Sequence, residues 1–143
     1  MVIAIFGESC TGKSTLADAL REKLNAQVFT GKDYLRLHGN EQMAQRLFMK
    51  KLTEAVDGED IIYVLTDAEL MKLIPAGAFR ILVTEELDVI KERFATRMRG
   101  VLPPPVADML ERKHGCFDSE PCDLHVHAGK PTAAEVCERI LHR

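Results

Sequence analysis

The sequence lacks several features that would assign it to a membrane, a nucleic acid or an oxidising compartment. It has no tryptophan, and none of its apolar runs approaches the roughly 20 residues that span a bilayer, so we expect no membrane partner. The net charge of -3 offers no overall basic surface for phosphate backbones, so we expect no nucleic-acid partner. The four cysteines form no disulfide-rich pattern, which favours free thiols and a cytoplasmic location.

The length of 143 residues predicts a single domain over residues 1–143, because a second hydrophobic core would not fit. The first six residues are apolar but have no basic region before them, so they indicate a strand and not a signal peptide. The chain shows no internal repeat and no low-complexity segment. The sequence leaves open whether the protein is a monomer or a homodimer.

Short apolar runs alternate with segments of helical periodicity along the whole chain. We expect helices over 13–24 and 43–56, from Leu87 to Met98 and after Thr132, with shorter helical segments near 32–37, 68–73 and 106–113. The expected strands are Val2–Phe6, Ala26–Thr30, Ile61–Leu65, Phe79–Thr84 and Leu124–Ala128. This alternation predicts an α/β fold, with a parallel sheet and helices on both faces.

The segment between the first strand and the first helix matches the phosphate-binding motif G-x-x-x-x-G-K-[ST] at every fixed position. In such a loop the main-chain N–H groups turn inward around a phosphate, and the following helix presents its positive end. Lys13 is expected to reach the β- and γ-phosphates, and the Ser14 hydroxyl to ligate Mg²⁺. The predicted nucleotide-binding residues here are Gly7, Glu8, Ser9, Cys10, Thr11, Gly12, Lys13, Ser14 and Thr15.

Asp67 is the first carboxylate after the buried run Ile61–Leu65, which places it at the carboxyl end of a central strand. Enzymes with this loop usually carry an acidic residue near the metal there, so Asp67 is a candidate Mg²⁺ ligand, directly or through water. An Asp at this position is also a favourable N-cap for the short helix that follows. The two roles do not exclude each other.

Together these residues resemble the P-loop nucleoside-monophosphate kinase group, which includes cytidylate, adenylate and shikimate kinases, and the small cytidylate-kinase-like members most of all. The resemblance implies a three-layer P-loop NTPase fold with sheet order 2-3-1-4-5, and a reduced lid at 97–121. It also relates Asp33 and Arg36 to the segment that faces the phosphoryl acceptor, and Glu92–Arg99 to the helix before an arginine-bearing lid.

Phosphoryl transfer needs positioned positive charge more than covalent chemistry. Arg93 and Arg97 share a helix face and are predicted to contact the nucleotide, with Arg97 acting in catalysis alongside Lys13. Asp33 is predicted to orient or deprotonate the acceptor, and Arg36 to bind an anionic acceptor. The alternatives are a solvated basic helix face for Arg93 and Arg97, an N-cap for Asp33 and a surface position for Arg36.

The sequence therefore predicts an ATP- and Mg²⁺-dependent small-molecule kinase, with a nucleoside monophosphate or a similar metabolite as acceptor. A nucleotide-binding regulatory protein, or a weak NTPase without an acceptor, is the alternative. Three histidines and two cysteines between His114 and His127 have metal-ligating chemistry, but their spacing repeats no known C-x-x-C pair. We interpret them as ordinary thiols and imidazoles.

Overall fold

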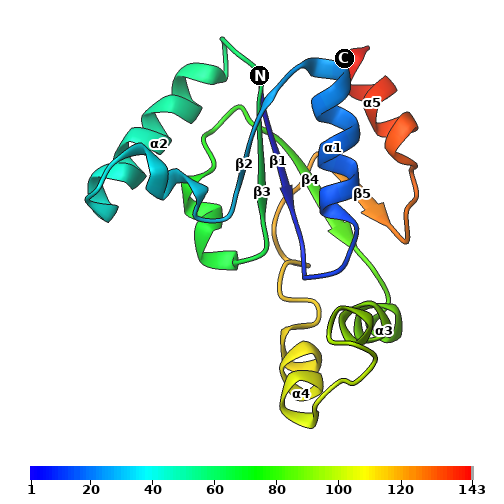
Figure 1. The fold of residues 1–143 in the computed structure, drawn as a ribbon. Coiled ribbons are helices and arrows are strands. Elements are labelled where there is room, and N and C mark those ends of the chain that lie inside the picture. The colour runs from blue at the N-terminus through cyan, green and yellow to red at the C-terminus, as the bar shows by residue number, and fades with distance from the viewer. Residues whose placement is uncertain (143) are drawn as a thin grey trace.

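A computed structural model describes residues 1–142 of the chain (Figure 1). Strands and helices alternate along it, as the sequence predicts. The strands are β1 (Val2–Phe6), β2 (Gln27–Thr30), β3 (Ile61–Leu65), β4 (Phe79–Thr84) and β5 (Leu124–His127). The α-helices are α1 (Lys13–Leu24), α2 (Glu41–Ala55), α3 (Leu87–Arg97), α4 (Pro104–Lys113) and α5 (Ala133–Leu141), and the 3₁₀ helices are η1 (Asp33–Leu37) and η2 (Ala68–Leu73).

The five strands form one parallel sheet in the order β2-β3-β1-β4-β5, which confirms the predicted fold class. Strand β1 lies at the centre, with Phe6 opposite Leu65 of β3 and Leu82 of β4. The carboxyl ends of parallel strands meet at one edge of the sheet, which is where ligands bind in open α/β folds. The loop after β1 therefore begins at the middle of that edge.

Both faces of the sheet are covered, because successive side chains of a strand point to opposite sides. On one face Ile3 and Ile5 of β1 pack with Leu20 of α1 and Val136 of α5. On the other face Phe6 belongs to the core that contains residues of α2, η1 and η2. All five residues of β1 are buried, which explains why the run is uniformly apolar and not alternating.

Helix α5 begins as the sequence predicts, with Thr132 as N-cap and Glu135 closing a capping box. The sequence predicts that helix α4 begins at Val106, but in the structure it begins two residues earlier, at Pro104. Proline is tolerated in the first helical turn because the N–H it lacks has no intrahelical partner there. The proline run therefore starts this helix and does not merely break the chain.

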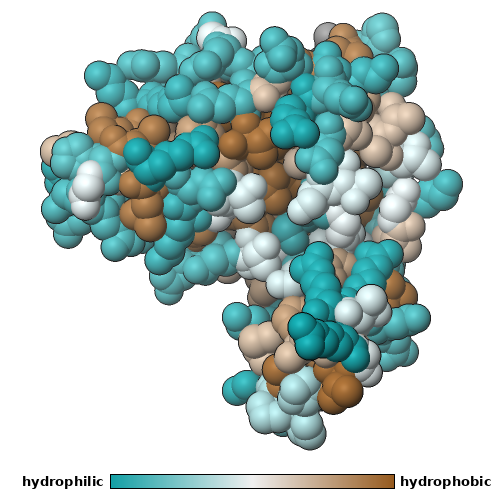
Figure 2. All heavy atoms as spheres, in the orientation of Figure 1, coloured by the Kyte–Doolittle hydropathy of each residue, from teal (hydrophilic) through white to brown (hydrophobic). Residues whose placement is uncertain are grey.

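Helices α3 and α4 pack on each other as a hairpin over residues 87–113 that extends away from the carboxyl edge of the sheet (Figure 1). Figure 2 shows it as a separate lobe below the main body. Its apolar cluster is formed around Ile90 of α3 and Leu110 of α4, and it includes Cys10 from the loop after β1. The hairpin is thus in contact with that loop. Over residues 1–142, no helix is long and apolar enough to cross a membrane.

Candidate functional site

The loop from Gly7 to Gly12 has the backbone that an anion-binding loop requires. A Cβ on Gly7 would lie 2.1 Å from the carbonyl oxygen of Val83 on β4, so only glycine allows this close approach. Gly12 has φ of +100°, and a Cβ there would meet open space. Helix α1 then starts at Lys13 without a side-chain cap and without an acidic residue in its first turn. Its first N–H groups and positive dipole end are therefore available to an anion.

Lys13 is folded onto its own loop. Its Nζ donates to the carbonyl oxygen of Glu8 and, at 3.4 Å, to Oγ1 of Thr11. The side chain is buried, and the cost of desolvating the ammonium lowers the pKa of Lys13 from 10.5 to about 8. Arg97 lowers this pKa further, while Cys10 and Glu8 oppose the shift. A phosphate group in the loop would supply the opposite charge that this ammonium lacks.

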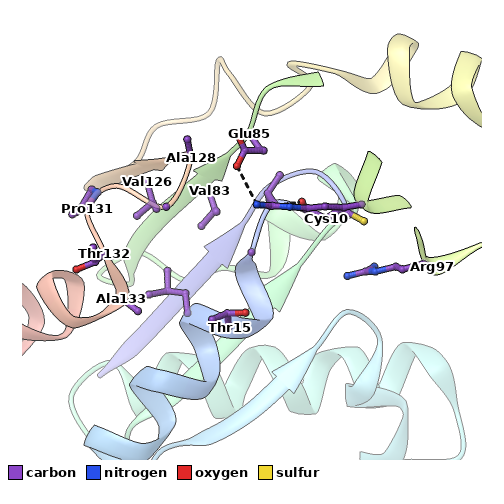
Figure 3. Close-up of a pocket in the computed structure, with 15 residues that line it drawn as sticks. Cys10, Thr15, Val83, Glu85, Arg97, Val126, Ala128, Pro131, Thr132 and Ala133 are labelled. Atoms are coloured by element: carbon purple, nitrogen blue, oxygen red, sulfur yellow. Dashed lines mark hydrogen bonds and ion pairs between the residues drawn. The ribbon is translucent and has the colours of Figure 1, made fainter. Parts of the chain in front are cut away.

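Two cavities open beside the loop. The larger, of about 490 Å³, runs from Gly12 and Thr15 to the segment between β5 and α5 (Figure 3). The smaller, of about 170 Å³, contains Lys13 and Ser14 together with the hydroxyl side chains of Thr30 and Thr66. Residues Ser9 to Thr15 line this smaller cavity without interruption. Arg97, at the end of α3, lines both cavities and so lies where they meet.

The distal wall of the larger cavity comes from the segment between β5 and α5. The N–H of His127 donates to the carbonyl of Lys130, and the N–H of Lys130 donates to the carbonyl of His127. The N–H of Ala128 donates to the carbonyl of Thr84. These bonds hold a tight turn at Ala128 and Gly129 against β4. Beyond it, the Thr132 hydroxyl is used by the capping box of α5. The wall offers main-chain groups and apolar side chains to a flat ligand.

Arg93 also lines the larger cavity, but its guanidinium already has partners. Nη1 donates to the carbonyl oxygen of Cys10 at 3.0 Å, and Nη2 lies 3.5 Å from Oε2 of Glu85. Glu85 is buried, and its other oxygen accepts the N–H of Glu86. The structure therefore brings both predicted arginines, Arg93 and Arg97, to the loop, and Arg93 is fastened to it.

The predicted acceptor residues Asp33 and Arg36 lie at the carboxyl edge of β2 but line neither cavity. Oδ2 of Asp33 accepts the N–H of Thr30 at 2.8 Å, which closes the turn into η1. The guanidinium carbon of Arg36 lies 4.4 Å from the ring centroid of Phe29, a cation–π contact. Arg36 is exposed, as its alternative as a surface arginine predicts. Asp33 is not the N-cap of η1, since Lys32 holds that position and no side chain caps the helix; the Asp33 carboxylate binds the preceding turn instead.

Asp67 follows β3 and caps η2, since its Oδ1 accepts the N–H of Glu69 at 3.0 Å. The hydroxyl of Tyr63 lies near both Asp33 and Asp67 and donates to the Gly31 carbonyl at 2.7 Å. Burial raises the pKa of Tyr63, and the charges of Tyr34, Asp33 and Asp67 raise it further. The two carboxylates thus lie on the same edge of the sheet, beside the smaller cavity.

A third cavity, of about 480 Å³, lies against the side chains of Thr84, His125 and His127. The Thr84 hydroxyl lies 2.6 Å from Nε2 of His125 and 2.8 Å from Nδ1 of His127. Nε2 of His127 lies 3.1 Å from Oε1 of Glu86. Within residues 1–142, no three His, Cys, Asp or Glu side chains are arranged to hold a metal ion.

Sequence reasoning missed three residues of the site, Thr30, Thr66 and Glu85, and one contact of a predicted residue, Glu8. Thr30 is the last residue of β2 and Thr66 is the first residue after β3, and both line the smaller cavity. Their position at the end of an apolar run was the available signal. Glu85 follows β4 in the same way. The side chain of Glu8 binds the segment after α4, with Oε1 3.0 Å from Nδ1 of His114. Nothing in the motif indicates that last contact, because its partner lies 106 residues away.

The sequence matches no known family profile and no curated protein. Solved structures, in contrast, resemble the fold closely. An uncharacterised protein from Eubacterium ventriosum superimposes with a TM-score of 0.71 at 15% identity, covering 99% of this chain and 96% of the other. Shikimate kinase from Acinetobacter baumannii, in complex with shikimate, gives 0.65 at 13% identity, with 99% and 90% covered.

A gluconokinase from Sinorhizobium meliloti gives a TM-score of 0.56 at 16% identity, with 99% of this chain and 89% of that chain covered. Identities this low establish the architecture and not the substrate. The sheet order, the loop after β1 and these neighbours agree with one another. The chain has the fold of the P-loop kinases.

Proposed function

We propose that the protein is an ATP- and Mg²⁺-dependent kinase that phosphorylates a small molecule, with a nucleoside monophosphate or a similar metabolite as acceptor. The observation that carries the proposal is that Arg97 lines both cavities together with residues of the phosphate-binding loop, and that the smaller cavity contains Lys13. A nucleotide in the larger cavity would direct its phosphates into the smaller one. Arg97 and Lys13 would then both be near the phosphoryl group that moves.

The residues of the larger cavity fit a nucleoside triphosphate. The base would lie between Leu16 and the turn at Ala128 and Gly129, where apolar surface and main-chain groups are available. The phosphates would accept hydrogen bonds from the N–H groups of the loop and of the first turn of α1. Lys13 would exchange its bonds to its own loop for phosphate oxygens, whose negative charge would raise the lowered pKa of Lys13.

Ser14 and Asp67 are the proposed metal residues. The Ser14 hydroxyl lines the smaller cavity, and Asp67 has one oxygen that is not used in capping η2. Mg²⁺ keeps several waters and takes few protein ligands beside phosphates, so one hydroxyl and a water-bridged carboxylate suit it. When bound, the ion neutralises charge on the phosphates and orients them.

Asp33 and Arg36 are the proposed acceptor residues, at the edge of β2 next to the smaller cavity. Asp33 accepts the Thr30 N–H through Oδ2, and Oδ1 is the atom we assign to an acceptor hydroxyl. Binding of an anionic acceptor requires Arg36 to leave the ring of Phe29 or to bind from its stacked position. Residues 97–121 would act as the lid that excludes water, which competes with the acceptor.

A phosphoryl-transfer screen with labelled ATP tests the proposal. The acceptors are nucleosides, nucleoside monophosphates, shikimate, gluconate and other sugars, each with and without Mg²⁺. Lys13→Ala should abolish transfer, while Lys50→Ala, on the exposed side of α2, should leave it unchanged. Slow hydrolysis that no acceptor stimulates would favour the regulatory protein or weak NTPase instead. Absence of ATP binding by calorimetry would refute both functions.

A further inference from the structure

The side chain of Glu8 connects the phosphate-binding loop to the residues that directly follow the C-terminal end of α4. Oε1 lies 3.0 Å from Nδ1 of His114, and Oε2 accepts the N–H of Gly115 at 3.0 Å. The side chain is only 9% exposed. A buried carboxylate is costly unless it is hydrogen-bonded, so these two contacts are a specific requirement of this residue.

The main chain of Glu8 is bonded to the same loop. Its carbonyl oxygen accepts from Nζ of Lys13 and, at 2.9 Å, from Oγ1 of Thr11. One residue therefore contacts the phosphate-binding lysine with its backbone and the segment after α4 with its side chain. Gly115 has φ of +82°, a conformation that glycine adopts readily and that places its N–H against Glu8.

The hairpin is fastened to the loop at a second point, on α3. Arg93 donates to the Cys10 carbonyl, and the Cys10 side chain packs in the cluster of Ile90 and Leu110. Arg97 follows one turn after Arg93 on the same helix. Because Arg97 lines both cavities, its position there depends on how the hairpin packs against the loop.

We propose that Glu8 is a positioning residue: it holds the α3–α4 hairpin on the phosphate-binding loop, in the placement that brings Arg97 to the phosphates. The effect of Glu8 on the reaction rests on the proposed kinase function. The mechanical part, that Glu8 holds the hairpin, is independent of any activity. The two parts therefore have separate tests.

The first test needs neither nucleotide nor activity. Glu8→Ala should speed exchange of the Gly115 amide and tryptic cleavage after Lys113 by at least roughly tenfold, the equivalent of one hydrogen bond to a charged group. Glu8→Gln keeps one acceptor oxygen and should give a smaller increase. The matched control is Glu111→Gln, which removes the Lys91–Glu111 ion pair inside the hairpin and should change neither rate.

Thermal unfolding identifies any variant that fails to fold. If Glu8→Ala does not fold, the exchange and cleavage rates of Glu8→Gln are compared with those of the wild-type protein instead. Equal exchange rates at Gly115 in the wild-type protein and in a folded Glu8 variant would overturn the proposal. So would an equal increase in the Glu111→Gln control, since that would show general loosening of the hairpin.

The second test is a double-mutant cycle between Glu8 and Arg97 in the phosphoryl-transfer assay. Glu8→Ala should lower kcat by roughly tenfold or more, with the KM for ATP within about twofold, because the loop amides and Lys13 remain. In an Arg97→Met background, Glu8→Ala should have no further effect on kcat. Additive losses would show that Glu8 does not act through Arg97. No transfer by the wild-type protein would refute the proposed function and leave the exchange result standing.

Discussion

Substituting Lys13 by methionine should stabilise the free protein while it abolishes nucleotide binding. The ammonium is buried beside Arg97, with a main-chain carbonyl and a hydroxyl as its hydrogen-bond partners. In the folded chain without ligand, the buried charge of Lys13 therefore lowers the free energy of unfolding, and the size of this effect depends on pH. Methionine fills the same space without the charge.

The magnitude follows from the shift in the Lys13 pKa, from 10.5 to about 8. Below pH 8 the lysine is charged in both states, and the shift costs the folded state about 3 kcal/mol. Between pH 8 and 10.5 the unfolded chain binds the additional proton, so stability rises with pH and the cost disappears. Methionine removes the bond from Nζ to the Glu8 carbonyl, which keeps only the Thr11 hydroxyl as donor, and this loss costs about 1 kcal/mol. The net gain at pH 7 is about 2 kcal/mol.

Urea denaturation of both proteins at pH 7 and at pH 9.5 measures this difference. The advantage of Lys13→Met at pH 7 should fall by about 2 kcal/mol at pH 9.5, because the wild-type lysine is then mostly neutral when folded. In thermal melts a 2 kcal/mol advantage corresponds to about 6 °C. ATP should raise the Tm of the wild-type protein only. A variant that is less stable than wild type at pH 7, or an advantage independent of pH, would refute the reasoning.

Three further changes test the fold around the site. Gly7→Ala forces a Cβ to within 2.1 Å of the Val83 carbonyl, so we expect a loss of about 3 kcal/mol or more and no ATP binding, measured by denaturation and calorimetry. Tyr63→Phe removes the donor to the Gly31 carbonyl and should cost about 1 kcal/mol in urea denaturation, whereas an unchanged midpoint would contradict the bond. Thr132→Ala removes the cap of α5 and should cost about 1 kcal/mol; equal stability at neutral pH would show that the cap contributes nothing.

Much of the fold could be predicted because its signals are local. Two continuous apolar runs predicted Val2–Phe6 and Ile61–Leu65 to the residue, since strands buried on both faces have few polar positions. Phe79–Thr84 was also predicted to the residue, from the buried apolar run at its centre, although Arg80 and Thr84 are only partly buried. The phosphate-binding loop followed from a motif in which each fixed residue has a steric or charge role. The capping box at Thr132 was equally local.

The remainder depends on contacts between distant segments. Whether Arg93 is free for phosphate is decided by Glu85 and the Cys10 carbonyl, which the sequence cannot place beside it. Asp67 caps η2 and also lies at the edge of the sheet, and Asp33 binds the turn before η1 at the same edge, so the sequence alone could not separate a local role from a role in the site. The roles of these residues toward an acceptor and a metal stay predictions.

The strand order has a consequence for how the protein is made. Strand β1, which carries the phosphate-binding loop, pairs with β3 and β4, and both neighbours are synthesised long after it. On the ribosome, β1 therefore waits without a partner until residues 61–84 have emerged. Pairing over such sequence separations is slow, so nucleotide binding should arise late in folding. An exposed β1 is then a natural target for chaperones that bind short apolar strands.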